Sequence, residues 1–376
     1  MSDDALPEPD RLDGAPHPRE TAALFGQNAA EAQFLAAFNT GRLPHGWLLS
    51  GPKGIGKASF AWRAARFLLA TPMVQDDGLF GAPPAPASLD IGDEHPVVPR
   101  LKALSEPGLC LIRRGPRPDG KALSDVIRVE EVRRLKNFFQ MSAGGNGRRV
   151  VIVDCADEMN PNAANALLKE LEEPPADAVL FLIAHRPSGL LPTIRSRCRV
   201  LRFQPLGADD LRAALQQAGF APPPEMAGLA ELAGGSVGTA ARLLSQDGLG
   251  LYADLLRLLQ GLPRLDRPLA LQLADATAGK QGEDRFDLTL NLLDTALARL
   301  ARRGASGTPL PEIVQDEDAL LARLSPGPLA ARGWADLAAS LTQRARRGRA
   351  VNLDPAALTF DMFLELDRQA ATLPAA

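Results

Sequence analysis

The fold of this chain is decided by the stretch Ser50-Gly51-Pro52-Lys53-Gly54-Ile55-Gly56-Lys57-Ala58-Ser59. Its spacing is that of a phosphate-binding loop, which needs glycines for close backbone approach, a lysine for the phosphates and a Ser or Thr for magnesium. The residues that meet the first two needs are Gly51, Gly54, Gly56 and Lys57. Ala58 stands where the hydroxyl is needed, so the stretch predicts a phosphate loop that has lost one magnesium ligand.

The surrounding segments give this loop the context that it requires. A short apolar strand is expected at residues 47–49 and a helix after the loop, and a helix N-terminus favours anions. Residues 149–154 are the clearest strand in the chain and end in Asp154, where an acid would complete the magnesium shell. The next residue is Cys155, at the place of a glutamate that positions water, and a thiol cannot act as that base.

The chain alternates strand-like and helix-like segments up to Pro205 and is helical after it. This order predicts a mostly parallel sheet covered by helices on both faces, followed by all-helical units. The acidic, proline-rich start predicts a flexible segment without function, and a second Pro- and Gly-rich stretch predicts few regular elements. The expected parts are a flexible segment at 1–20, an α/β domain at 21–205 with an irregular insertion at 71–125, a small helical domain at 206–246 and a helical domain at 247–376.

Composition and charge exclude several classes of protein. The 376 residues carry 42 Lys and Arg against 45 Asp and Glu, so the formal charge of -3 provides no global field to attract a polyanion. The three cysteines are widely separated and the histidines show no ligand spacing, which predicts neither disulfides nor a metal site. Without a signal peptide or an apolar run of about 20 residues, we expect a cytoplasmic protein with no membrane partner. The basic run at 344–349 is interpreted as a solvated or partner-binding face, with DNA contact as the lesser alternative.

Several stretches, taken in order, resemble the bacterial clamp loader subunits of DNA polymerase III, a family of AAA+ proteins. Besides the loop, they are LFGQ at 24–27, LPHG at 43–46, NALLKELEEPP at 165–175, SRC at 196–198 and VNLDP at 351–355. The resemblance is specific over about residues 21–244, and over the C-terminal third it rests mainly on helical character. Among those subunits the chain is most similar to the end member of the ring, which does not hydrolyse ATP.

The resemblance implies an α/β AAA+ module, a small helical lid and an all-α C-terminal collar through which five subunits form a ring. The implied partners are the motor subunits (gamma/tau) and the delta subunit and, through the complex, the sliding clamp and primed DNA. The family's Ser-Arg-Cys motif matches Ser196, Arg197 and Cys198. In the family its arginine is a finger that points into the ATP site of the adjacent motor subunit, where a planar cation stabilises transition-state charge.

The departures from the hydrolysing members of the family agree with one another. Two more groups are replaced, a polar residue at the end of the next strand and an arginine of the lid. The four replaced positions are Ala58, Cys155, Ala184 and Gly238. The two acids that follow, Asp157 and Glu158, are expected to cap the next helix rather than to substitute for the missing base. The resemblance therefore implies a non-hydrolysing stator that donates Arg197 in trans and is no enzyme by itself.

Such a stator requires no cofactor, although a nucleotide or phosphate could still occupy the vestigial loop beside Asp154. Many relatives carry a four-cysteine zinc module after the phosphate-loop helix, but residues 71–125 contain only Cys110, so no zinc is predicted. Two alternatives stay open. One is a catalytically active, DNA-stimulated AAA+ ATPase in which the substitutions are tolerated, and the other is a DNA-binding adaptor that acts through the basic run.

Overall fold

The computed structural model describes residues 8–12, 14–21, 23–72, 85–140, 147–224, 226–279 and 282–372. These residues form two compact units. The first extends to Ala221 and includes Gly235–Gly238, and the second consists of Pro222–Gly234 and the chain from Thr239 onward. The separate lid at 206–246 stays a prediction, since helix α7 (Ala208–Gln217) falls in the first unit and α8 (Ala227–Ala233) in the second.

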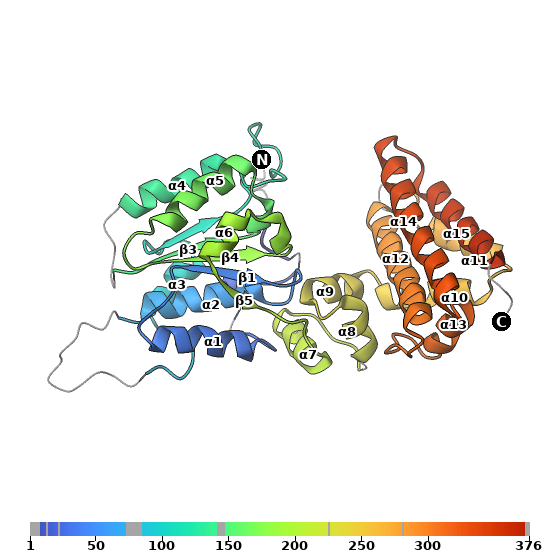
Figure 1. Cartoon of the computed structure of the whole chain (residues 1–376), viewed down its shortest axis with the longest axis horizontal. Helices are drawn as coiled ribbons and strands as arrows, with labels where there is room; N and C mark the ends of the chain where they lie inside the picture. Colours follow the sequence, from blue (N-terminus) through green and yellow to red (C-terminus); the bar gives the residue numbers. More distant parts are fainter. Residues whose placement is uncertain are drawn as a thin grey trace. The chain divides into compact units, whose positions relative to one another are not determined.

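The described part of the first unit is built on a sheet of five parallel strands (Figure 1). They are β1 (Gly46–Ser50), β2 (Leu109–Ile112), β3 (Arg149–Val153), β4 (Ala178–Ala184) and β5 (Arg199–Arg202), in the spatial order β2-β3-β4-β1-β5. Every neighbouring pair is parallel, and Trp47 of β1 lies in register between Phe181 of β4 and Arg199 of β5. All five strands therefore end at one edge of the sheet, where the ligands of open α/β sheets bind.

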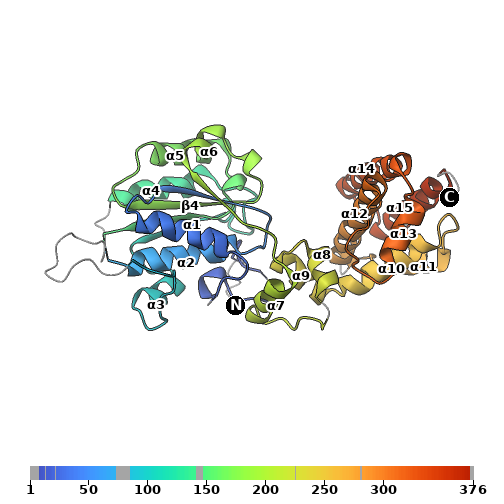
Figure 2. The ribbon, with the colours of Figure 1, turned by 60° about the horizontal axis from the view of Figure 1, so that its bottom comes forward.

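Helices cover both faces of this sheet (Figure 2). One face carries α1 (Asn28–Asn39), α2 (Lys57–Ala70) and α3 (Val97–Lys102), and the other carries α4 (Val129–Gln140), α5 (Pro161–Glu172) and α6 (Pro192–Arg197). Alternate strand residues divide between the two cores: Trp47 and Phe181 face the first, and Leu48 and Leu180 the second. The ring of Phe34 packs 5.1 Å from that of Trp47, centroid to centroid. The predicted parallel sheet with helices on both faces is confirmed.

The described residues add detail to two expectations about irregular segments, which stay predictions. The described part of residues 71–125 contains α3 and β2, and β2 forms an edge of the sheet against β3. Four residues are too few to show a period, and it is the pairing with β3 that makes them a strand. At the other segment, residues 8–12 and 14–20 are packed on the first unit, with His17 fully buried. Residues 1–7, 13 and 73–84 of the two expected segments lie outside the described residues.

The described regular elements of the second unit are all helices. Beyond α8 it contains α9 (Val237–Ser245), whose first two residues belong to the first unit, α10 (Gly248–Gln260), α11 (Arg267–Asp275), α12 (Glu283–Ser306), α13 (Glu317–Leu324), α14 (Pro328–Ala350) and α15 (Pro355–Ala371). Helices α12 and α14 pack along each other, as α11 and α15 do (Figure 1). The indole of Trp334 is fully buried and donates to the carbonyl of Leu324 at 2.8 Å. The all-α C-terminal region is confirmed, and none of the described helices is long and apolar enough to cross a membrane.

Candidate functional site

The phosphate loop joins β1 to α2, as the sequence predicts. Gly51 has a φ of +155°, and a Cβ there would lie 2.7 Å from the backbone oxygen of Phe203. Gly54 has a φ of +80°, and a Cβ there would lie 2.3 Å from Oγ of Ser236. Any other residue would force the backbone or its neighbour to move, so glycine is required at both positions. The loop is thus enclosed by the chain after β5 and by the segment Gly235–Gly238.

Lys57 is turned back onto its own loop. Its side chain is buried, and Nζ donates to the carbonyl oxygen of Gly51 at 2.6 Å and to that of Pro52. Burial lowers the pKa of Lys57 to about 8, and the nearby acidic groups offset that effect only in part. A lysine that serves the loop carbonyls must give up these bonds before it can reach a phosphate.

Asp154 follows the last residue of β3, at the edge of the sheet that carries the loop. Its amide donates to the carbonyl of Ile112 in β2 at 2.8 Å, and its side chain is buried. Burial raises the pKa of Asp154 to about 7, and the carboxylates of Asp10 and Glu158 add to the rise. A carboxyl group whose pKa is raised in this way is a weaker ligand for magnesium, which prefers charged oxygens.

Cys155 comes next, in the left-handed conformation with a φ of 61°. Its Sγ lies 3.3 Å from Nε2 of His185 and 4.0 Å from Oδ1 of Asp154. Burial raises the pKa of the Cys155 thiol and lowers the pKa of His185 to about 4, so both groups are neutral at pH 7. His185 was set aside as a metal ligand for lack of ligand spacing and was not predicted at this site, although its place directly after Ala184, at the end of β4, could have indicated that it lies near Asp154.

Asp157 and Glu158 do not cap the next helix, contrary to the expectation. They lie in the short 3-10 turn η2 (Ala156–Glu158), where the carboxylate of Asp157 accepts the amides of the two residues after β4, each at 3.0 Å. Glu158 instead pairs with Arg114 at 3.1 Å. The cap of α5 is Asn160, because the proline that follows it starts the helix and leaves the cap position to the preceding side chain.

The other replaced positions lie at the same loop. Ala58 is in the first turn of α2, and Ala184 is paired in register with Ser50, the last residue of β1. The amide of Val237 donates to the carbonyl of Gly54 at 2.9 Å, which places Gly238 beside the loop. The structure therefore brings together the four positions at which the resemblance implies a replaced group.

Replacing Asp154 with Asn is expected to flatten the pH dependence of the first unit's stability. The folded-state pKa of about 7 lies above the ordinary value of 3.8, so the stabilising effect of the bound proton is complete below about pH 4 and is lost as the pH rises through 7. Between pH 5 and pH 8 the unchanged chain should lose roughly 2 to 3 kcal/mol that the Asn variant keeps.

The measurement is urea denaturation at the two pH values, followed by amide hydrogen exchange of β3 and β4. The variant Asp119→Asn, at an exposed carboxylate of the same unit, serves as the control and should behave like the unchanged chain. If Asp154→Asn and Asp119→Asn showed the same pH dependence, the raised pKa of Asp154 would be disproved.

Arg197 lies at the end of the sheet where the strands begin, whereas the loop lies at their carboxyl ends. It is the last residue of α6, and a Cβ on Gly46, the first residue of β1, would lie 3.2 Å from its carbonyl oxygen. The loop begins after the last residue of β1, so the length of that strand, roughly 16 Å, separates the two. The guanidinium is 36% exposed, donates to the carbonyl of Thr193 at 2.9 Å and pairs with Glu172 at 2.9 Å.

The two flanking residues of the motif have structural contacts. The hydroxyl of Ser196 donates to the carbonyl of Thr193 at 3.1 Å, within the same helix. Burial raises the pKa of Cys198 to about 12, and its sulfur packs close to Gly46. A protonated, packed thiol and a helix-bonded hydroxyl hold the end of α6 in place, and Arg197 is the charged member of the motif.

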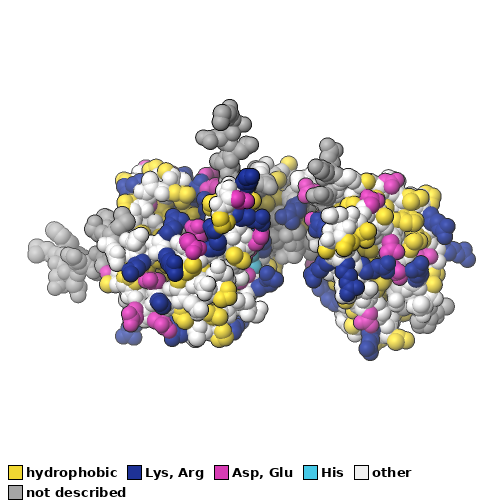
Figure 3. All heavy atoms as spheres, turned by 90° about the horizontal axis from the view of Figure 1, so that it is seen from above, with side chains coloured by type: hydrophobic (Ala, Val, Ile, Leu, Met, Phe, Trp, Pro, Cys, Tyr) yellow, Lys and Arg dark blue, Asp and Glu magenta, His cyan; other side chains and the backbone are white. Residues whose placement is uncertain are grey.

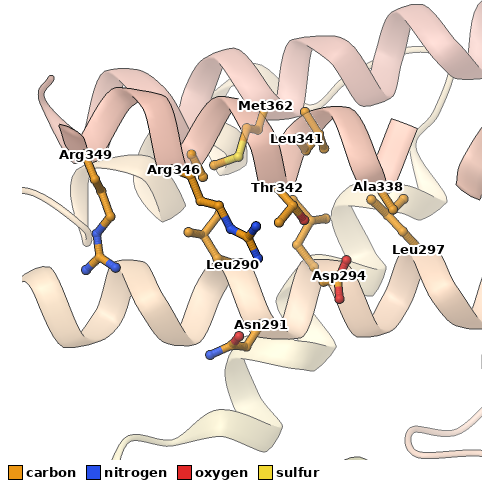
Figure 4. A pocket seen from close by; sticks show the side chains of 12 residues that line it. Leu290, Asn291, Asp294, Leu297, Ala338, Leu341, Thr342, Arg346, Arg349 and Met362 are labelled. Atoms are coloured by element: carbon orange, nitrogen blue, oxygen red, sulfur yellow. The ribbon is translucent and has the colours of Figure 1, made fainter. Parts of the chain in front are cut away.

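The basic run of α14 lies beside a groove in the second unit (Figure 4). The groove has a volume of about 320 Å³, an apolar floor that includes Leu290 and Met362, and Arg346 and Arg349 among its lining residues. Figure 3 shows Lys and Arg side chains close to hydrophobic ones on the face of this unit that it displays. Arg344 is paired with carboxylates of α15, and Arg349 with one of α12 at 2.7 Å. Two of the run's four arginines are thus neutralised within the unit, which favours a solvated or partner-binding face over DNA contact.

The fold and the loop together define the class of protein. A parallel sheet covered on both faces, a phosphate loop between β1 and α2, an acid at the end of β3 and a helical C-terminal region make up an α/β AAA+ module followed by an all-α part. Among the residues that the structure describes, no three His, Cys, Asp or Glu side chains are grouped so as to hold a metal ion. The absence of zinc stays a prediction.

Comparison with known proteins narrows this class. Residues 26–207 match the family described as DNA polymerase III, delta subunit. The chain is 38% identical over 226 residues to DNA polymerase III subunit delta-prime of Pseudomonas aeruginosa, covering 59% of this chain and 61% of that protein. It is 35% identical over 165 residues to the delta-prime subunit of Bacillus subtilis, covering 44% of each. To the gamma/tau subunit of Mycobacterium tuberculosis it is 32% identical over 205 residues, covering 53% of this chain and 31% of that one.

The matched region coincides with the α/β part of the first unit, from the start of α1 to the residues after β5. That region matches the DNA polymerase III delta-subunit family, and over it the chain is similar to delta-prime subunits. The chain spans less than two thirds of the length of these relatives.

Proposed function

We propose that this chain is the non-hydrolysing stator of the DNA polymerase III clamp loader. It occupies the delta-prime position in a five-subunit ring with the motor (gamma/tau) and delta subunits, in the cytoplasm. Through the ring it supports ATP-driven loading of the sliding clamp at primed DNA. It is no enzyme by itself, requires no cofactor and donates Arg197 to the ATP site of a neighbouring motor subunit. The names of the matched relatives, delta-prime and gamma/tau subunits, support these partners.

The proposal is supported mainly by the placement of charged and neutral groups at the two ends of the strands of the sheet. At the loop, a hydroxyl, a carboxylate and an arginine are missing, Lys57 is bonded to its own loop, and Cys155 and His185 are neutral. At the opposite edge, Arg197 is exposed and charged. An arginine in this position is separated from its own loop by the sheet, but it can enter the site of an adjacent subunit, where its planar fork fits a phosphate.

Reconstitution of the complex from motor subunits, the delta subunit and this chain tests the proposal. We expect clamp loading on primed DNA to require this chain. The variant Lys57→Met should leave both the ATPase rate and the loading rate of the complex within about twofold, because no hydrolysis takes place at this loop. The variant Lys53→Met, at the exposed lysine of the same loop, is the matched control.

The same preparations separate the two alternative functions. The isolated chain should release no phosphate from ATP and magnesium. Turnover by the isolated chain that Lys57→Met removes would instead establish a DNA-stimulated ATPase. Salt-dependent DNA affinity of the isolated chain, lost when Arg346 and Arg347 are both replaced by Ala, would favour the adaptor.

A further inference from the structure

The start of the chain forms an ordered segment, which we call the N-terminal strap and define as residues 8–12 and 14–20. Its centre is His17, which is fully buried with its ring 5.8 Å from that of Trp62 in α2, in an edge-on contact. Nδ1 of His17 accepts the amide of Arg19 at 3.0 Å, so the ring proton is on Nε2, which lies 3.0 Å from Oδ2 of Asp10. The carbonyl of Arg19 in turn accepts from Arg66 of α2 at 3.1 Å. Side-chain and backbone contacts thus hold the strap on the helix that follows the phosphate loop.

Charge pairs tie the strap to the sheet as well. Arg113 donates to the carboxylates of both Asp10 and Glu8, and Glu8 also accepts from Arg19 at 2.7 Å. The Asp10 side chain is only 2% exposed. Burial would raise its pKa, but the contacts with His17 and Arg113 outweigh burial and leave the pKa below its ordinary value. Asp10 is therefore a buried carboxylate, and its charge is compensated from both sides.

These contacts place the strap over the carboxyl edge of the sheet. The carbonyl of Ile112 accepts the amide of Asp154, and Arg113 directly follows Ile112. Because Asp10 is bonded to Arg113, it is held near Asp154, the acid of the site. Two residues further along the strap, Cδ1 of Leu12 lies 3.9 Å from where a Cβ of Gly238 would be. The phosphate loop lies between Asp154 and Gly238. Leu24, just beyond the strap, packs on this loop, and its Cδ1 lies 2.9 Å from where a Cβ of Gly56 would be.

We propose that the N-terminal strap is an internal occupant of the phosphate-loop site, which it closes to nucleoside di- and triphosphates. The strap spans the edge at which a parallel sheet binds its ligands, from the acid of β3 to the first turn of α9. It also brings the carboxylates of Glu8 and Asp10 to the carboxyl end of the sheet, where Asp10 is close enough to Asp154 to help raise its pKa, and carboxylates and phosphates repel each other strongly where water is excluded. The two arginines that contact these carboxylates, Arg113 and Arg19, are already bonded to them.

The inference concerns the same loop as the proposed function but does not depend on it. A chain whose strap is displaced could still donate Arg197, and a chain that fails as a stator could still be closed by its strap. The two experiments therefore fail independently.

The test compares the full-length chain with the variants Arg113→Ala and Asp10→Asn, which break the strap's charge pairs. The matched control is Arg117→Ala, since Arg117 pairs with an exposed carboxylate, Asp125, in the same stretch of the chain. A fluorescent ADP with magnesium is titrated into each protein, and hydrogen exchange reports the amides of residues 8–20. The apparent affinity for ADP is reduced in proportion to the fraction of molecules whose strap is open and whose site can bind. If the strap is open in fewer than about one molecule in ten, opening it in the two variants should raise the apparent ADP affinity at least tenfold.

Faster exchange of the strap together with tighter ADP binding in the two variants, and neither change in Arg117→Ala, is the expected result. A second expectation concerns the unchanged chain: saturating ADP should speed exchange of the strap, because the two cannot occupy the site together. Unchanged ADP affinity in both variants would overturn the inference, whichever way the strap responds. Tight ADP binding to the unchanged chain with the strap still protected would overturn it as well.

Discussion

Replacing Arg197 with Ala is expected to slow ATP hydrolysis at the adjacent motor site by roughly a thousandfold, the lower end of what an arginine finger contributes. The reason is that the guanidinium compensates charge that develops on the transferred phosphoryl group, which a methyl group cannot do. Arg197→Lys should recover little of the rate, because an ammonium lacks the planar pair of donors. Folding should be preserved, since the ion pair with Glu172 is exposed and such pairs contribute about 1 kcal/mol or less.

Single-turnover hydrolysis is the appropriate measurement, in complexes in which only the motor subunit next to this chain keeps an intact phosphate loop. Arg195→Ala is the matched control, because Arg195 is exposed in the same helix two residues earlier. Gel filtration of the complex shows whether assembly is intact. An assembled complex in which Arg197→Ala hydrolyses ATP as fast as Arg195→Ala would remove Arg197 from the proposed mechanism.

Replacing Glu317 with Ala is expected to destabilise the second unit by about 3 to 5 kcal/mol, the usual result of breaking a buried ion pair from one side. Glu317 is 1% exposed and accepts from the hydroxyl of Tyr252 at 2.7 Å and from Nε of Arg299 at 2.7 Å. It also accepts the amide of Ile313 at 2.7 Å. Without this carboxylate, Arg299 stays buried with one partly exposed carboxylate, Glu231, at 2.8 Å and the carbonyl of Pro311 as its partners. Three helices, α10, α12 and α13, lose the group that joins them.

The loss should be measurable by hydrogen exchange at increasing urea. The amides of α12 and α13 should become unprotected at a lower urea concentration than in the unchanged chain, and those of the first unit should be unaffected. Asp336→Ala removes an exposed carboxylate 3.9 Å from Arg332 and should change the stability by less than about 0.5 kcal/mol. Equal effects of the two substitutions would show that the Glu317 network contributes nothing beyond a surface pair.

Much of the first unit could be predicted from local pattern. The strand before the loop, the glycines and the lysine, and the strand that ends in Asp154 depend on residues close together in sequence, and the structure has them as expected. The short strand β2 could not be predicted in this way, because four residues carry too little periodicity and their partner, β3, is distant along the chain. The contacts of Asp157 and His185 likewise could not be predicted, because they form where the end of β3 lies beside the end of β4.

The acidic, proline-rich start shows the limit of composition as a guide. Such a composition is typical of segments that bury too little apolar surface to fold by themselves. Here the segment is ordered by something else: buried charge pairs and one buried imidazole ring, supplied by residues of the sheet and of α2. No spacing in the sequence indicates that Asp10 and His17 belong together with Arg113.

By itself, the sequence determined that this chain carries a phosphate-loop pattern after a buried strand, that Ala58 stands where that pattern has a hydroxyl, and that an arginine precedes the last strand of the sheet. These features are local, so their spacing along the chain is enough to specify them. Only the tertiary structure decided that the loop and Arg197 lie at opposite ends of the strands of one sheet and that residues 8–20 are bonded to Arg113 after β2 and to Arg66 of α2. Both depend on pairings between distant residues, such as Asp10 and Arg113, which are 103 positions apart and meet only because the sheet brings their segments together.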